Sequence, residues 1–226
     1  MTWTIPNILT TLRLLAAPGV VLLFLYFTRP WADWFALVLF VGAAVTDWFD
    51  GYLARLWKQE SKLGAMLDPI ADKAMVVIAL LLIAGLSGVN RSDGMDPWIL
   101  LPATFIIFRE VFVSGLREFL GDTAGTLKVT KLAKWKTTSQ MVAIGILFGT
   151  GIFAHMYIER TVGMDPSVLE DIFAGGADPL GIRLIDRAEA MTWWAGVGLL
   201  WVAALLTLVT GFDYFKKSLP YLKDEV

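Results

Sequence analysis

Six apolar stretches, each about as long as a membrane-spanning helix, set narrow limits on the folds open to this chain. They cover Ile8–Phe27, Ala32–Leu53, Pro69–Leu86, Trp98–Leu120, Thr137–Tyr157 and Met191–Phe212. Hydrophobic residues make up 57% of the 226-residue chain and charged residues only 18%, below the roughly 25% of soluble domains. The sequence therefore predicts an all-α integral membrane protein, a bundle of six transmembrane helices that forms a single domain over residues 1–226.

The placement of lysine and arginine predicts the orientation of the bundle, because these residues gather in cytoplasmic loops. With the amino terminus in the cytoplasm, 14 of the 19 Lys and Arg residues fall on the cytoplasmic side. The carboxyl terminus and the turn between the second and third stretches then share that side. The acidic segment Glu159–Glu189 becomes an extracytoplasmic excursion at about 158–190, with a short helix expected at Ser167–Phe173.

Composition also excludes some functions. The chain contains no cysteine, so it can form neither disulfides nor a thiolate metal site. Its formal net charge of −2 gives no overall attraction to nucleic acid, and we expect no nucleic-acid partner. The expected surroundings are instead a lipid bilayer.

Four carboxylates lie around the turn between the second and third stretches, where acids are costly without partners. Asp47 and Asp50 are three residues apart and Asp68 and Asp72 are four apart, so each pair shares one helix face. A short turn around 58–63 would bring the two pairs together. Oxygen ligands suit hard cations, and four acids exceed the needs of one Mg²⁺. The pattern therefore predicts two divalent cations, Mg²⁺ or Mn²⁺, at a site suited to phosphoryl displacement.

Small residues and one arginine accompany the acids. Gly51 and Gly64 remove side chains where a substrate could approach the two helices, and Ala54 leaves room on the face of the first acid pair. Arg55 lies one turn beyond Gly51 and can pair with a phosphate.

Simpler interpretations of the same residues stay open. Asp68 followed by Pro69 is a good N-cap for a helix that begins at the proline. The first acid pair could merely form ion pairs with Arg55 or Arg13. A cation-coupled transporter would also carry acids in the membrane, although these usually lie on several helices near mid-membrane. We expect the lone His155 to be structural or interfacial.

The spacing D-x2-D-G-x2-A-R-x8-G-x3-D-x3-D, from Asp47 to Asp72, matches the signature of the CDP-alcohol phosphatidyltransferase family at every defined position. The resemblance covers nearly all of 1–153 and the last helix. The family's amino-terminal motif is similar to Pro6, Asn7, Thr10 and Arg13. The segment 109–140 resembles one bacterial branch through Arg109, Glu110, Ser114, Gly115, Leu116, Arg117, Glu118, Lys134, Lys136, Thr137, Thr138 and Gln140. The acidic segment Glu159–Glu189 is longer than this branch leads us to expect.

The resemblance implies the reaction and its partners. Members of that branch transfer the phosphatidyl group from CDP-diacylglycerol to sn-glycerol 3-phosphate, giving phosphatidylglycerol phosphate and CMP. The alternative is the same chemistry with inositol phosphate, serine or phosphatidylglycerol as acceptor. The resemblance also implies a homodimer in the bacterial inner (cytoplasmic) membrane, with a polar cavity that opens to the cytoplasm.

The resemblance further assigns roles to residues. It implies that Asp47, Asp50 and Asp68 bind metal, with Asp68 bridging the two ions. It makes Asp72 the general base, which also touches the second metal. The residues that contact the cytidine diphosphate part are then Gly51, Ala54, Arg55 and Gly64.

The acid signature does not encode the acceptor, so the acceptor is predicted from basic residues elsewhere in the chain. Glycerol 3-phosphate carries a phosphate dianion and needs basic residues on the cytoplasmic side; the candidates are Arg109, Arg117, Lys131, Lys134 and Lys136. Arg109 is the strongest because it lies inside an apolar stretch, although a pair with Glu110 would also explain it. The lysines could instead set topology and attract anionic lipid.

Overall fold

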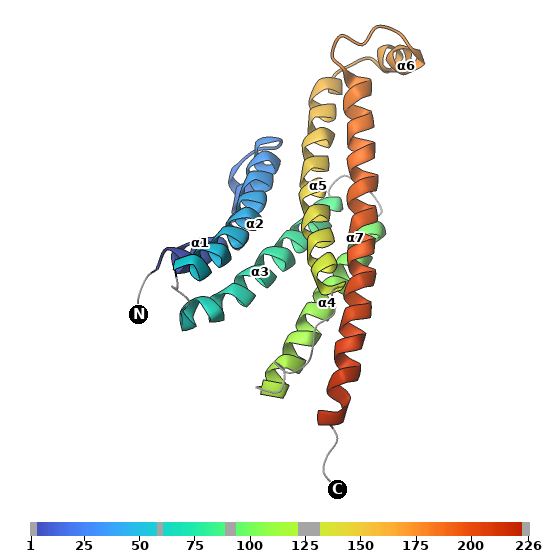
Figure 1. The fold of residues 1–226 in the computed structure, drawn as a ribbon. Helices are drawn as coiled ribbons and strands as arrows, with labels where there is room; N and C mark the ends of the chain where they lie inside the picture. The colour runs from blue at the N-terminus through green and yellow to red at the C-terminus, as the bar shows by residue number, and fades with distance from the viewer. Residues whose placement is uncertain (1–3, 58–60, 89–93, 122–131, 223–226) are drawn as a thin grey trace. The chain divides into compact units, whose positions relative to one another are not determined.

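The computed structural model describes residues 4–57, 61–88, 94–121 and 132–222, apart from the side chains at 48, 50–55, 57, 133 and 134. The regular structure in these ranges is helical throughout (Figure 1). The helices are α1 (Ile5–Tyr26), α2 (Trp31–Trp57), α3 (Lys62–Ser87), α4 (Pro97–Leu120), α5 (Leu132–Thr161), α6 (Pro166–Ala174) and α7 (Ile182–Ser218), followed by a 3-10 turn, Leu219–Tyr221.

The chain divides into two compact units, and α3, α5 and α7 each contribute to both. Unit 1 comprises Met1–Ala79 and Ile144–Gly196, and unit 2 comprises Leu80–Ala143 and Val197–Val226. A single domain over residues 1–226 stays a prediction.

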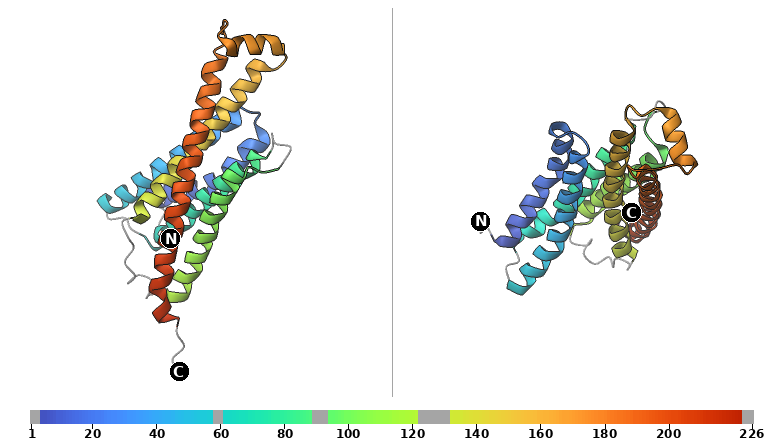
Figure 2. Two further views of the ribbon diagram at one scale, coloured as in Figure 1. Left: turned by 90° about the vertical axis from the view of Figure 1, so that its right-hand side faces the viewer. Right: turned by 90° about the horizontal axis from the view of Figure 1, so that it is seen from above.

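In unit 1, α1 and α2 lie side by side (Figures 1 and 2). The buried ring of Phe148, on α5, has its centroid 6.5 Å from that of Phe24 on α1 and 5.9 Å from that of Phe40 on α2. The buried residues of α1 recur every three or four positions, from the polar Asn7, Thr10 and Arg13 to the apolar Ala17 and Val20. This single face is what a helix buries against neighbours. Apolar packing at one end of α1 therefore fixes where its polar end lies.

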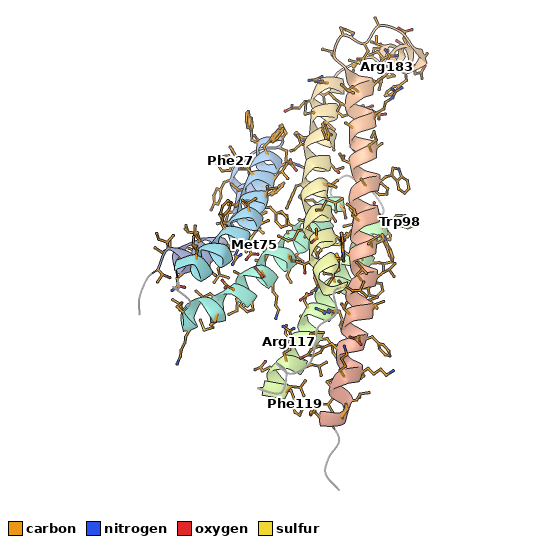
Figure 3. The ribbon with its side chains drawn as sticks, in the orientation of Figure 1. Phe27, Met75, Trp98, Arg117, Phe119 and Arg183 are labelled. Carbon is orange, nitrogen blue, oxygen red and sulfur yellow. The ribbon has the colours of Figure 1, made fainter. Side chains whose placement is uncertain are left out.

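In unit 2, α4 runs alongside the C-terminal half of α7 (Figure 2). Near one end, Trp201 donates a hydrogen bond of 3.1 Å to the carbonyl of Trp98, and the two rings meet edge to face. Further along, the rings of Phe112 and Phe215 lie 5.6 Å apart. Trp98 and Arg117, labelled in Figure 3, mark the two ends of α4. These contacts hold the polar side chains of α4 against α7.

Within the described ranges, five helices are long and apolar enough to cross a membrane, namely α1, α3, α4, the greater part of α5, and α7 with the turn that follows it. Their apolar windows are only 22% to 44% buried, so most of these side chains face outward, as lipid contact requires. The chain is therefore an all-helical, multi-pass membrane protein. Helix α2 is also long but contains Asp33, Asp47, Asp50 and Arg55 and is not in this set. A sixth span and the cytoplasmic cavity stay predictions.

Helix α3 begins earlier than the sequence suggested. It starts at Lys62, so Asp68 and Pro69 lie within the helix, and the interpretation of Asp68 as its N-cap is wrong. Ser61 is the N-cap instead, because its hydroxyl oxygen accepts a hydrogen bond of 3.0 Å from the amide of Gly64. Both acids of the second pair, Asp68 and Asp72, therefore lie inside α3 and not at its N-terminus.

The connection between α5 and α7 contains the expected short helix. The prediction of Ser167–Phe173 is confirmed by α6, Pro166–Ala174, which lies beside the upper end of α7 in Figure 1. Both α5 and α7 continue past their apolar stretches, so the intervening connection runs only from 162 to 181.

Two aspartates cap helices in this connection. The hydroxyl and the amide of Ser167 donate to Asp165, at 2.7 and 2.9 Å, and lower the pKa of that carboxyl. Partial burial opposes ionisation of Asp178, but the amides of Arg183 and Ile182 outweigh it, so its pKa is also lowered. The ionised aspartates therefore stabilise the connection at pH values above the pKa that they have in the unfolded chain. This stabilisation is lost as the pH falls through their lowered pKa in the folded protein.

Candidate active site

The first candidate site, in unit 1, is built around one buried guanidinium. The Arg13 side chain, only 2% exposed, pairs through one terminal nitrogen with Asp47 and lies 3.5 Å from Oδ1 of Asp72. Its other terminal nitrogen lies 3.3 Å from Oδ1 of Asp68. The three carboxylates are 47%, 56% and 50% exposed respectively. Helices α1, α2 and α3 thus bring three of the four predicted acids around one guanidinium, and each acid keeps an exposed side.

The amino-terminal motif supports this cluster from α1. The hydroxyl of Thr10 donates a hydrogen bond of 2.8 Å to Asp68, which fixes that carboxylate. The carbonyl oxygen of the Asn7 side chain accepts a hydrogen bond of 2.8 Å from Ser61, the N-cap of α3. One face of α1 therefore positions both an acid and the start of the helix that carries it.

Other predicted residues of this site lie partly outside the described part of the chain. Asp50, Gly51, Ala54 and Arg55 belong to α2, but their side chains lie outside the described residues. Their backbone is helical through Trp57, so Asp50 lies about one turn beyond Asp47. Gly64 is described and lies in the first turn of α3, against Asn7.

The donor set fits a hard cation in its chemistry, because the candidate ligands are carboxylates. Among the described residues, no three His, Cys, Asp or Glu side chains are close enough together to hold a metal ion. Asp47, Asp68 and Asp72 nevertheless surround a single cationic group, and all their donors are carboxylate oxygens. The ion pair of Asp47 with Arg13, proposed above as the simpler explanation, is also present. The positions of the acids relative to a bound metal stay a prediction.

We expect Gly64→Ala to lower enzymatic turnover roughly ten- to hundredfold, since small displacements of a catalytic cluster have effects of this size. A Cβ atom at position 64 would lie 2.9 Å from Oδ1 of Asn7 and 3.4 Å from the hydroxyl of Ser61, so it would disturb the contact between α1 and α3. Gly85→Ala, on the same helix with nothing within 4 Å of the added atom, is the matched control and should act normally. Equal turnover of the two variants would contradict the expectation.

The second candidate site, in unit 2, is a cluster of basic side chains around one acid. Glu110, on α4, pairs with Lys136 of α5, and Nη1 of Arg109 lies 3.2 Å from the same carboxylate oxygen. The other terminal nitrogen of Arg109 lies 3.5 Å from the hydroxyl of Thr210, on α7. Lys136 is buried and the other two charged side chains are largely buried. Among the described residues, two cations therefore share one carboxylate here.

The face of α7 beside this cluster carries buried polar atoms. Among the described residues, no hydrogen-bond partner is present for Nε of Arg109 or for the hydroxyls of Thr207 and Tyr214. The guanidinium of Arg117 lies over the ring of Tyr214, 5.5 Å from its centroid. Buried polar groups normally have partners, so this face is suited to a polar ligand or water.

A glycine lets Arg109 lie against α7. A Cβ atom on Gly211 would lie only 2.8 Å from Cγ of Arg109 and 3.3 Å from its Nε. The absence of a side chain at position 211 therefore determines how closely the arginine can approach the helix.

The remaining acceptor candidates are only partly described. Lys131 lies outside the described residues, as does the side chain of Lys134. The site residues predicted from the sequence do not include Ser61, Thr210, Gly211 and Tyr214. A serine three residues before Gly64 was a usable N-cap signal, and polar residues spaced along the apolar last stretch were a weaker one.

Comparison with known proteins gives a consistent result. The profile of CDP-alcohol phosphatidyltransferases matches residues 3–165. A protein of Cereibacter sphaeroides named CDP-diacylglycerol--glycerol-3-phosphate 3-phosphatidyltransferase is 64% identical over the full length of both chains. Proteins of the same name from Pectobacterium atrosepticum and Escherichia coli K12 are 44% identical over 96% of each chain and 33% identical over the full length of both.

Proposed function

The chain belongs to the CDP-alcohol phosphatidyltransferase family, and we propose that it transfers the phosphatidyl group of CDP-diacylglycerol to sn-glycerol 3-phosphate, releasing CMP. The observation that carries this proposal is the 64% identity, over the whole of both chains, with a relative named for that reaction. The chain is accordingly a transferase of phospholipid biosynthesis. The clustered carboxylates Asp47, Asp68 and Asp72 support the same assignment, because they supply the donors that a diphosphate substrate with metal requires.

In this proposal, four aspartates form the catalytic centre. Asp47, Asp50, Asp68 and Asp72 would hold two divalent cations, Mg²⁺ or Mn²⁺. When bound, such ions neutralise the diphosphate and stabilise the departing CMP. Thr10 keeps Asp68 in its orientation through the 2.8 Å hydrogen bond. Gly51, Ala54, Arg55 and Gly64 contact the cytidine diphosphate part of the substrate.

Asp72 accepts the proton of the attacking hydroxyl. The hydroxyl oxygen of the acceptor bonds to the phosphorus that carries the diacylglycerol. The bond from that phosphorus to the bridging oxygen breaks, and CMP departs with the electron pair. The carboxylate of Asp72 is 56% exposed, which supports access of an acceptor from the aqueous side. Correct placement of a weak base matters more here than its basicity.

The basic cluster of unit 2 supplies the candidates for binding the phosphate of the acceptor. Arg109 and Lys136 share the single carboxylate of Glu110, so a dianion would compensate buried positive charge that is otherwise costly. Arg117 adds a further cation near Tyr214. Lys131 and Lys134 are further candidates on sequence grounds.

The setting of the reaction is also part of the proposal. Six membrane spans, a homodimer, and an active site and both termini in the cytoplasm of a bacterial cell are supported by the family resemblance and the lysine and arginine count. The five described spans support a multi-pass arrangement.

The acceptor assignment is tested with purified protein in detergent, CDP-diacylglycerol and Mg²⁺ or Mn²⁺. CMP release should require glycerol 3-phosphate and should stay at background with inositol phosphate, serine or phosphatidylglycerol. Release with one of those acceptors instead would reject the acceptor but keep the reaction class. Ion flux in vesicles without any CMP release would reject both.

A further inference from the structure

We propose that Arg13 is a built-in counter-cation of the carboxylate cluster, which stabilises the metal-free protein and competes with divalent cations for the same acids. The inference rests on the proposed function, since it presumes that the acids bind metal. Arg13 is thereby a positioning residue, because it acts on the acids and not on the substrate.

The geometry gives Arg13 a place within the cluster. Its two terminal nitrogens lie toward three carboxylates from two other helices, Asp47 on α2 and Asp68 and Asp72 on α3. The guanidinium fork suits this arrangement because it presents several donors at fixed angles. These acids are separated from Arg13 by 34 to 59 positions in the sequence, so the contact joins three helices.

Burial explains why a counter-cation is needed. The Arg13 side chain is almost fully buried, whereas each of its three partners is about half exposed. Three carboxylates gathered this closely repel one another unless positive charge lies between them. A cation of higher charge density is the natural competitor for the same oxygens.

Arg13 and a divalent cation compete for the same carboxylates, so metal affinity and the strength of the ion pairs of Arg13 depend on each other. A divalent cation that binds the acids must weaken their pairing with the guanidinium, so Arg13 lowers metal affinity in the same measure as metal weakens its ion pairs. The hydroxyl of Thr10 also donates to Asp68, so this acid has a hydrogen-bond partner besides Arg13.

The test compares the full-length protein with Arg13→Gln by Mn²⁺ titration and by thermal unfolding, neither of which uses catalysis. Arg13→Gln should bind Mn²⁺ at least about tenfold more tightly, because a neighbouring positive charge is lost. In chelator its Tm should fall by about 5 °C or more, and saturating Mn²⁺ should restore most of that loss. Arg13→Lys, which keeps the charge, should have a metal affinity close to that of the wild type.

The possible outcomes separate this inference from the proposed function. Wild-type protein that binds Mn²⁺ while Arg13→Gln binds it no more tightly would overturn the role of Arg13 alone. Wild-type protein that neither binds Mn²⁺ nor releases CMP would count against the proposed function. If Arg13→Gln does not fold in chelator, the double variant Arg13→Gln/Asp72→Asn decides. Its folding without metal supports charge compensation, and its failure to fold overturns it.

Discussion

Asp72→Asn is expected to lower CMP release from CDP-diacylglycerol by roughly a thousandfold, while the protein stays folded. The substitution keeps the size of the side chain but removes its charge, so it removes both a proton acceptor and a proposed metal ligand. General-base catalysis alone contributes about 10²- to 10⁴-fold. Asp72 lies on α3 at the open side of the cluster, 3.5 Å from Arg13, and the closer ion pair of Arg13 with Asp47 stays intact. The measurement is CMP release with saturating glycerol 3-phosphate.

A matched control separates chemistry from loss of charge. Asp213, on α7, is also about half exposed and pairs with Lys217 at 2.6 Å, four residues on. Such a pair contributes only about 0.3–0.5 kcal/mol, so Asp213→Asn should retain normal turnover and a normal Tm. Turnover of Asp72→Asn close to that of the control would refute the role of Asp72 as base. A large loss of Tm in Asp72→Asn alone would show that folding, and not chemistry, had failed.

Much of the first site could be predicted from residue spacing, because helices convert short separations into shared faces. Asp68 and Asp72 lie on one helix, as expected from their separation of four, and Asp47 meets them from α2. Residue spacing does not predict which residue of a third helix joins these acids. Arg13 comes from another helix, and only the apolar packing of α1 determines where its guanidinium lies. The sequence offered this pair merely as one alternative among several.

The first residues of the helices were predicted from the sequence less accurately than the helices themselves, for a physical reason. Hydropathy reports where lipid contact begins, but backbone hydrogen bonding continues beyond it. Helix α3 therefore starts at Lys62, with Ser61 as cap, although Pro69 is the stronger start signal in the sequence. Pro69 lies inside the helix, and the nearby Ala71 and Met75 pack into the core. By contrast, Asp96 and Pro97 mark the true start of α4, where cap and hydropathy agree.

The second large effect is expected from Arg109→Gln, which should reduce kcat/KM for glycerol 3-phosphate by about a hundredfold, mainly through a higher KM. Truncating one partner of a buried charged contact costs about 2–5 kcal/mol. The remaining pair of Glu110 with Lys136 is unaffected, so the fold of unit 2 should survive. The KM for CDP-diacylglycerol should change little, because the proposed contacts of that substrate lie elsewhere. Initial rates with each substrate varied in turn measure the split. A rise in both KM values would contradict the assignment.

Gly211→Ala tests the same role without touching the charge. The new Cβ atom would lie 2.8 Å from Cγ of Arg109, so the arginine must shift its stem while keeping its guanidinium. Gly198→Ala, on the same helix and in the same unit, adds the same atom where nothing lies within 4 Å. If Arg109 binds the acceptor phosphate, Gly211→Ala raises the KM for glycerol 3-phosphate and Gly198→Ala does not. Because alanine favours helix over glycine by about 1 kcal/mol, neither variant should weaken α7 through its backbone. Equal KM values would mean that the position of Arg109 does not govern acceptor binding, whatever its charge contributes.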